Sequence, residues 1–360
     1  METISLARGV PSPECLAEEE LADCAREVLA RDGKSILTYG TGAGYPPLRE
    51  LIGEWFDVPA ERVVITNGSL QGFSLLAEHF AATPLVFVES PTYDRPLKIL
   101  NENGYQVVPL ALDDDGLVPA ELDRALQASG KPAFVYTIPT FQNPSGRTIP
   151  EPRRREIVEL ARAAGVTLLE DDPYGLIRFE GTAPTSLFEL APETVVYTSS
   201  FSKTVAPGLR VGWFILPPGL AAAITLRANS TYISPVHLGE AVVYEFIRRG
   251  SFEPNLRRMN ELLAARRDAM LAALERHLSG ARWSQPEGGY FVWLELPEGT
   301  SAKEVLDRAE GVTAVLGTDF GGRENTIRLA YSYVSPEDID EGIGRLAAAL
   351  EAVERREPVP

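Results

Sequence analysis

The strongest constraint on the fold is a series of short apolar runs, rich in β-branched residues, that alternate with helix-like segments between residues 60 and 216. Each run is short and lacks polar alternation, which is typical of strands covered on both faces. The candidate strands are RVVIT (62–66), LVFVE (85–89), YQVVPL (105–110), AFVYTI (133–138), VTLLE (166–170), VVYTS (195–199) and VGWFIL (211–216). Intervening stretches such as EPRRREIVELARAAG are amphipathic at helical spacing. The pattern predicts a three-layer α/β domain with a mostly parallel seven-stranded sheet.

The pattern changes after about residue 217, where long helical segments become dominant. One of them, NLRRMNELLAARRDAMLAALERHLSG, continues past twenty residues without a proline. Strand candidates YFVWLEL and TIRLAYS follow, separated by the helix-like SAKEVLDRAEG, and a helix closes the chain. We therefore expect a small α+β domain over residues 231–360 and a large domain over 32–230. Residues 10–31 look helical, and we assign the N-terminal segment 1–31 to the small domain by proximity of the termini.

Charge and residue usage point to small-molecule chemistry. The formal net charge is −17, which argues against binding to nucleic acid or to anionic membranes. Cys15 and Cys24 do not form a metal-ligand spacing, and His79, His237 and His277 lie far apart, so we expect no metal. The chain begins without a leader-like segment and contains no stretch of eighteen apolar residues, so we expect a cytoplasmic enzyme.

The segment SSFSKTVAPGLRVG (199–212) carries the strongest chemical signal. It places the hydroxyls of Ser199, Ser200 and Ser202 and the guanidinium of Arg210 close to the amine of Lys203. Hydroxyls and an arginine form a phosphate site, and a neighbouring lysine can form an imine with an aldehyde. The alternative is a solvated lysine in a polar surface loop.

The chain resembles the fold-type I aminotransferases, and among them the α-aminoadipate and kynurenine aminotransferase subgroup. The resemblance covers nearly the whole chain. It rests on ordered matches in TYGTGAGYPPLRE, TNGSLQGF, ESPTYDRP, PTFQNPSG, LLEDDPYG, SSFSKTVAPGLR, EGGYFVWLEL and ENTIRLAYS. It implies the fold of pyridoxal 5′-phosphate (PLP) transferases, with a PLP-binding large domain and a small α+β domain.

By this resemblance, Lys203 holds PLP as a Schiff base and then moves a proton between the substrate α-carbon and the cofactor. Asp171 pairs with the pyridine nitrogen and keeps it protonated, with Asp172 as its rival for this role. Asn143 and Tyr174 donate hydrogen bonds to the phenolic oxygen of PLP. The alternative for Asn143 is a simple turn in NPSG.

The resemblance also implies a stacking residue and a divided phosphate site. Tyr93 stacks on the cofactor ring, although it could instead be a packing residue. Ser200, Arg210 and a helix start bind the phosphate, with Ser69, Leu70 and Gln71 as the residues of that helix start. Close relatives often carry a polar side chain where this chain has Leu70, so that contact can come only from the backbone. Tyr39 reaches the phosphate of the neighbouring subunit, which implies a homodimer with shared active sites.

Two arginines are the candidate substrate ligands. The resemblance assigns Arg328 to the substrate α-carboxylate, which it clamps together with Asn143, and the alternative is a surface arginine. Arg8 stands where close relatives have a glycine. If the N-terminal segment folds over the site, Arg8 favours acidic or carbonyl-bearing side chains, including those of glutamate and 2-oxoglutarate. Otherwise it points to solvent or pairs with an acid such as Glu14.

Several other functions compete with the prediction of a PLP-dependent aminotransferase that acts on amino acids and 2-oxo acids. GTGAG (40–44) resembles a dinucleotide-binding loop, but Gly40, Gly42 and Gly44 lack the G-x-G-x-x-G spacing and Pro46 follows. A transcriptional regulator would need a winged-helix domain, for which we see no room, and a basic stripe, which is not apparent. A non-enzymatic ligand sensor is a further alternative. The main alternative is a PLP-dependent lyase, decarboxylase or amino-acid cyclase on the same scaffold.

Overall fold

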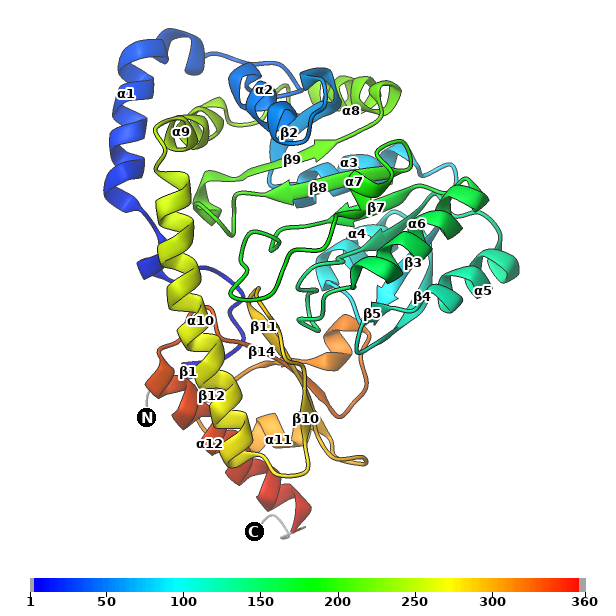
Figure 1. Cartoon of the computed structure of the whole chain (residues 1–360), viewed down its shortest axis with the longest axis vertical. Coiled ribbons are helices and arrows are strands. Elements are labelled where there is room, and N and C mark those ends of the chain that lie inside the picture. The colour runs from blue at the N-terminus through cyan, green and yellow to red at the C-terminus, as the bar shows by residue number, and fades with distance from the viewer. Residues whose placement is uncertain (1–2, 356–360) are drawn as a thin grey trace.

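The computed structural model describes residues 3–355 and consists of two parts joined by one long helix. In Figure 1 the larger part, built on a wide sheet, lies above the smaller one, and helix α10 (Phe252–His277) runs down one side from the first to the second. Residues 1–2 and 356–360, which belong to the predicted N-terminal and C-terminal segments, lie outside the described residues.

The large part is built on an eight-stranded sheet of order β2-β9-β8-β7-β6-β3-β4-β5. Strands β8, β7, β6, β3 and β4 run parallel, whereas β9 is antiparallel to both of its neighbours and β5 is antiparallel to β4. The strands are β2 (Val63–Asn67), β3 (Leu85–Ser90), β4 (Gln106–Asp113), β5 (Gly116–Leu117), β6 (Phe134–Thr137), β7 (Leu168–Asp171), β8 (Val195–Ser200) and β9 (Val211–Ile215). The predicted fold class is confirmed, and only the two-residue β5 was not foreseen because it is too short to show a pattern.

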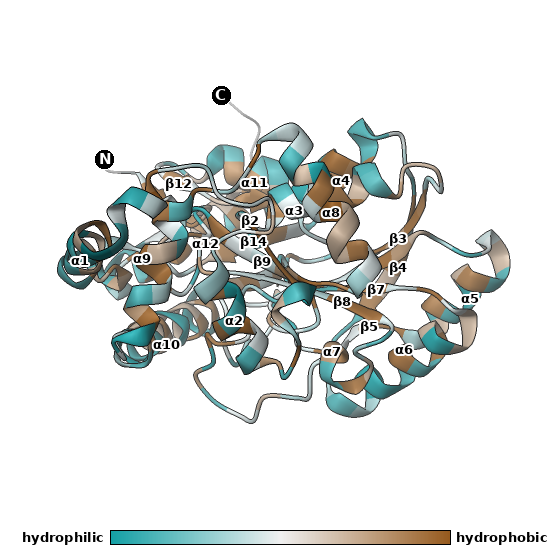
Figure 2. Ribbon diagram, turned by 90° about the horizontal axis from the view of Figure 1, so that it is seen from above, coloured by the Kyte–Doolittle hydropathy of each residue, from teal (hydrophilic) through white to brown (hydrophobic). Residues whose placement is uncertain are grey.

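Helices cover both faces of this sheet. One face carries α2 (Pro46–Trp55), α5 (Pro119–Ser129), α6 (Glu151–Ala164), α7 (Leu187–Leu190) and α9 (His237–Arg248), and the other carries α3 (Ser69–His79), α4 (Asp94–Glu102) and α8 (Pro218–Thr231). Successive strand residues therefore enter different cores: Val63 and Ile65 pack on the first face and Val64 on the second. Figure 2 shows the strands largely brown between helices whose outer sides are teal.

The smaller part combines a four-stranded antiparallel sheet with two helices. The sheet order is β10-β11-β14-β13, and a two-stranded parallel pair, β1 with β12, lies beside it. The elements are β1 (Ile4–Ser5), β10 (Arg282–Trp283), β11 (Phe291–Glu295), α11 (Ala302–Arg308), β12 (Val312–Thr313), β13 (Val315–Leu316), β14 (Thr326–Ala330) and α12 (Pro336–Glu354). Their core includes Met270 and Leu274 of α10, which packs along α12.

The structure divides the chain differently from the prediction. Only β1 of the N-terminal segment pairs within the small part, whereas α1 (Glu18–Ile36) packs along α9, as Figure 1 shows. Helix α9 in turn buries Val242 and Phe246 in the core of the large part. We therefore propose that α1 belongs with the large part, because its apolar side packs on α9, and that the chain passes from the large part back to the small part within α10.

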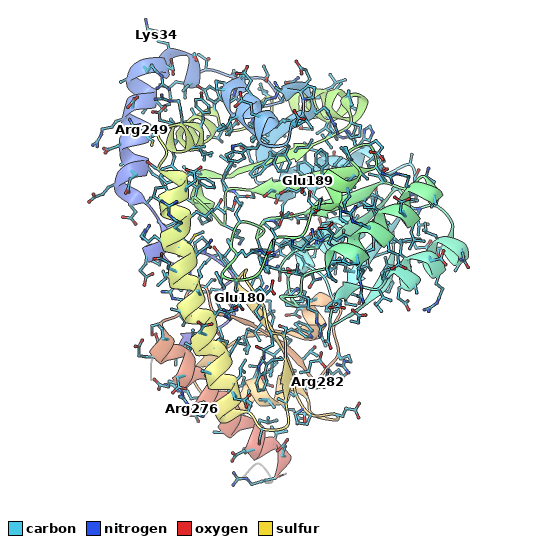
Figure 3. All side chains as sticks on the ribbon, in the orientation of Figure 1. Lys34, Glu180, Glu189, Arg249, Arg276 and Arg282 are labelled. Atoms are coloured by element: carbon cyan, nitrogen blue, oxygen red, sulfur yellow. The ribbon has the colours of Figure 1, made fainter. Side chains whose placement is uncertain are left out.

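Charged side chains such as Lys34 point outward, as Figure 3 shows. Among residues 3–355, no helix is long and apolar enough to cross a membrane, and no group of three His, Cys, Asp or Glu side chains could hold a metal ion. Cys15 and Cys24 are buried free thiols.

Candidate active site

A cavity of about 360 Å³ lies at the carboxyl ends of the parallel strands, where the small part and the N-terminal segment close over the large sheet. Ligands of open α/β sheets bind at this edge. The cavity brings together ten predicted site residues: Ser69, Leu70, Tyr93, Asn143, Asp171, Tyr174, Ser200, Lys203, Arg210 and Arg328. Gln71, Tyr39 and Arg8 do not line it.

Lys203 follows β8 and points into this cavity. Its Nζ donates a hydrogen bond to the Gly9 carbonyl at 2.8 Å and lies 5.9 and 5.6 Å from the ring centres of Tyr174 and Tyr290. Burial, and then the positive charge of Arg328, lowers the pKa of this amine to about 8. A neutral amine, which is the nucleophilic form, is therefore accessible near neutral pH.

Asp171 ends β7 and lies in the floor of the cavity. Its Oδ2 accepts a hydrogen bond from the Tyr136 hydroxyl on β6 at 2.7 Å. Within residues 3–355 its Oδ1 is buried without any hydrogen-bond partner. Burial raises the pKa of this carboxyl to about 7. A buried carboxylate oxygen without a partner costs free energy, so Oδ1 is suited to accept a hydrogen bond from a positively charged N–H group of a ligand.

Asp172, the rival acid, points away from this cavity. Its Oδ1 accepts from the Gly175 backbone N–H at 2.8 Å and its Oδ2 from the Tyr197 hydroxyl at 3.1 Å. Asp172 directly follows the last residue of β7 and does not line the cavity, whereas Asp171 does. The geometry favours Asp171.

The start of α3 forms the anion-binding end of the cavity. Helix α3 has no side-chain cap, so backbone N–H groups at its N-terminus are available to an anion. Gly68 has φ of +81°, and a Cβ there would lie 2.3 Å from Nη2 of Arg210. A Cβ on Gly212 would lie 2.3 Å from the Ser69 backbone nitrogen. These glycines let the Arg210 guanidinium and strand β9 approach the helix start closely.

Ser200 and Gln71 differ in how they meet this end of the site. The Ser200 hydroxyl lines the cavity and hydrogen-bonds the Ser202 hydroxyl at 2.8 Å. The Gln71 side chain instead accepts the Asn67 backbone N–H at 2.9 Å. The predicted cofactor contact of Gln71 is therefore not supported, because its amide is engaged in closing the turn before α3.

Arg328 on β14 forms the opposite wall of the cavity. Its Nη1 donates a hydrogen bond to Oδ1 of Asn143 at 3.1 Å, and its Nη2 donates one to the Ala7 carbonyl at 2.8 Å. Its Cζ lies 4.3 Å from the centre of the Phe291 ring. Its Nε is buried without a partner among the described residues. Burial lowers the pKa of this guanidinium, because the positive charge is removed from water. A bound carboxylate would stabilise that charge, so the site is suited to bind one.

Arg8 lies outside the active site, which corrects its predicted role. Its guanidinium stacks 4.2 Å from the Tyr333 ring and lines a separate surface cavity with Asp338 and Glu341. The carbonyls of Ala7 and Gly9 face the site, so the side chain between them is directed away. The alternative partner Glu14 is bound to Arg266 instead.

Tyr93 and Tyr174 line the cavity as expected. Burial raises the pKa of Tyr93 to about 12 and that of Tyr174 well above its usual value, so both hydroxyls stay protonated. A protonated phenol can donate a hydrogen bond to an oxygen of a ligand. Tyr39 lies in a loop after α1, and 82% of its side chain is exposed.

A buried polar network behind the site was missed in the sequence. The Gln142 amide donates to Oε2 of Glu89 at 3.1 Å and to the Pro91 carbonyl at 2.8 Å, and its oxygen accepts the Ser145 N–H at 2.8 Å. The Thr137 hydroxyl donates to Oε1 of Glu89. The network ties the loop before Tyr93 to the loop that carries Asn143. The only sequence signals were an acid within the apolar run LVFVE, Glu89, and an amide in the loop motif PTFQNPSG, Gln142.

We predict that Gln142→Ala lowers the free energy of unfolding by about 1–3 kcal/mol, because Glu89 then keeps a buried oxygen with fewer donors. Gln127→Ala is the matched control, since Gln127 is exposed and bonds only Asp123 on the same helix. Urea unfolding of both variants measures the difference. Equal stability of the two variants would contradict the prediction.

The family model for aminotransferases of class I and II matches residues 4–346, so the chain belongs to this family. The enzyme is a PLP-dependent aminotransferase. Among its relatives, the 2-aminoadipate transaminase of Thermus thermophilus is 36% identical over 97% of this chain and 90% of its own length. The aromatic-amino-acid aminotransferase 1 of Thermococcus litoralis is 36% identical over 97% of this chain and 88% of its own.

A solved structure with a closely similar fold is the kynurenine aminotransferase of Pyrococcus horikoshii, crystallised with the amino form of the cofactor and with kynurenine. It is 36% identical, with a TM-score of 0.94, over 99% of this chain and 92% of its own. The residues of the cavity fit the cofactor that this family uses: an amine of lowered pKa, a buried carboxylate oxygen without a partner, and an anion site at a helix start.

Proposed function

We propose that the enzyme exchanges the amino group of an amino acid with a 2-oxo acid, with glutamate and 2-oxoglutarate as one substrate pair. The observation that carries the proposal is the single cavity in which Lys203, Asp171 and Arg328 converge. The likeness to a 2-aminoadipate transaminase supports an acidic substrate. Arg95, a further cation that lines the cavity, also supports one.

The bound PLP supplies an aldehyde that captures amines and a ring that withdraws electrons from the substrate α-carbon. Lys203 would hold the cofactor through this aldehyde, and its amine is the group placed to move a proton at the substrate α-carbon. The unpaired Oδ1 of Asp171 would accept the N–H of the pyridine nitrogen and so favour its protonated form. The Arg328 guanidinium binds the substrate α-carboxylate beside Asn143.

Two backbone carbonyls of the N-terminal segment border the site. The Gly9 carbonyl accepts a hydrogen bond from Lys203 and the Ala7 carbonyl accepts one from Arg328. The segment therefore lies directly beside the groups that we assign to the cofactor and to the substrate carboxylate.

We also propose that the enzyme is a homodimer in which Tyr39 reaches the phosphate of the partner's cofactor. Exposed apolar surface supports this proposal, because Tyr39 is 82% exposed and Leu37 is 70% exposed. Ile233 and Val236 are also exposed, and they flank Ser234, which accepts a hydrogen bond from Gly40. The buried free thiols of Cys15 and Cys24 support a reducing, cytoplasmic location.

A half-reaction experiment tests the substrate proposal. The holoenzyme is mixed with one amino acid at a time, without an oxo acid, and both the aminated cofactor and the 2-oxo acid are quantified. We expect one equivalent of each per active site with glutamate, and return of the original spectrum on addition of 2-oxoglutarate. Release of carbon dioxide or of ammonia, without amination of the cofactor, would instead indicate a decarboxylase or a lyase.

A further inference from the structure

The three glycines of GTGAG (40–44) allow close packing against the end of α8 and the start of α9. A Cβ on Gly40 would lie 1.7 Å from Nε2 of His237, and one on Gly42 would lie 2.7 Å from Oδ1 of Asn229. Gly44 has φ of +93°, and a Cβ there would lie 2.8 Å from Oε2 of Glu240. No larger residue fits at any of these positions without movement. We call residues 39–45 the arm loop.

Three side chains hold the arm loop by its backbone. The Gly40 N–H donates to the Ser234 hydroxyl at 3.2 Å and the Gly42 N–H to Oδ1 of Asn229 at 2.8 Å. The Tyr45 N–H donates to Oε2 of Glu240. All three acceptors lie within residues 229–240. The arm loop is thus fixed along its length by a different part of the same subunit.

Glu240 is an unusual residue for such a contact because it is 1% exposed. Its second oxygen, Oε1, is buried without a partner among residues 3–355, as are the Tyr232 hydroxyl and Nε2 of His237. Burial raises the pKa of the Glu240 carboxyl to about 7. A buried carboxyl that bonds only one backbone N–H lowers stability, so its presence is better explained by the position that it gives the loop.

The hydrogen bonds that hold the arm loop begin directly after a stretch with two exposed side chains. Helix α1 ends at Ile36, and the side chains of Leu37 and Tyr39 are 70% and 82% exposed, whereas the next residue, Gly40, is bound to Ser234. A tyrosine on a free loop would have to be ordered when it binds a ligand, and a fixed base reduces that entropic cost.

We propose that Asn229, Ser234 and Glu240 are positioning residues that hold the arm loop so that Tyr39 projects into the active site of the partner subunit. The proposal rests on the dimer with shared sites proposed above. It assigns these residues to cofactor binding in the opposite subunit and leaves the site of their own subunit unaffected.

The test uses the double variant Asn229→Ala/Ser234→Ala, which removes two acceptors from partly exposed positions. The matched control is Ser230→Ala, because Ser230 lies on the same helix and bonds only the Leu226 carbonyl. We expect the PLP dissociation constant of the double variant to rise about tenfold and kcat at saturating PLP to stay near normal. The control should match the wild type. An unchanged dissociation constant in the double variant would overturn the proposal.

Subunit mixing then shows which of the two active sites depends on the residues that hold the arm loop. The double variant and Lys203→Ala are co-expressed with different tags, and the heterodimer is purified. Its single Lys203 lies on the subunit with the loosened arm, but that site receives an intact arm from the Lys203→Ala subunit. We expect this site to recover wild-type PLP affinity.

Failure of a verified heterodimer to recover affinity would overturn the positioning role across subunits. Failure of the proposed dimer is distinguishable, because sedimentation of the wild-type holoenzyme would then show a monomer and no heterodimer would form. Glu240→Gln keeps an oxygen that can accept the Tyr45 N–H, so this variant should retain the PLP dissociation constant of the wild type.

Discussion

Replacement of Lys203 by alanine is expected to lower kcat/KM by about 10³–10⁴-fold, the scale of losing a group that both binds the reacting carbon and transfers its proton. The chain has five lysines, and Lys34, Lys98, Lys131 and Lys303 are all exposed at the surface. Lys203 alone lies in the cavity, where its amine has a pKa of about 8. No other lysine can take its place.

Steady-state kinetics measure the loss of kcat/KM. Borohydride reduction of the holoenzyme followed by peptide mapping identifies the lysine that holds the cofactor, because it fixes the cofactor to that lysine. The label should fall on the peptide that contains Lys203, and the Lys203→Ala enzyme should take no label while still binding PLP through its phosphate. Lys131→Ala is the control for removal of a surface lysine. A label on any other lysine would refute the assignment.

The sequence predicted those features that depend on local pattern. Seven apolar runs became seven strands because strands buried on both faces leave an uninterrupted apolar signature. The roles of Asp171 and Lys203 were assigned by the family resemblance, and the structure brings both into one cavity because parallel strands present their carboxyl ends at one edge. The helix start after Gly68, assigned in the same way, forms the anion-binding end of that cavity.

Features that depend on distant partners could not be predicted in this way. Glu89 finds Gln142 and Thr137 only after the strands have assembled, because these partners lie 53 and 48 residues away. The direction of Arg8 depends on how an irregular segment bonds the site through the neighbouring carbonyls. The packing of α1 on α9 likewise joins segments about two hundred residues apart, and proximity of the termini pointed to the wrong partner.

Asp171→Asn is expected to lower kcat by about 10²–10³-fold, equivalent to roughly 3–4 kcal/mol of barrier, while PLP still binds. The reason is electrostatic. Oδ1 of Asp171 is the unpaired carboxylate oxygen in the floor of the active-site cavity, and an amide in its place carries no negative charge to hold a proton on the pyridine nitrogen. The bond from the Tyr136 hydroxyl can persist in the variant, so the fold around β7 should be preserved.

Asp172→Asn is the matched comparison, since the same chemical change is made one residue along the chain. Asp172 accepts from Gly175 and Tyr197 on the far side of β7, so its loss should act on stability, by about 1–2 kcal/mol, with kcat within a few-fold of wild type. Steady-state kinetics at saturating PLP, together with urea unfolding of both variants, separate the two effects. A nearly normal kcat for Asp171→Asn beside an inactive but folded Asp172→Asn would reverse the roles. Because Asp171 lines the cavity and Asp172 does not, we expect one acid alone to contact the cofactor, and the pair of variants identifies which one does.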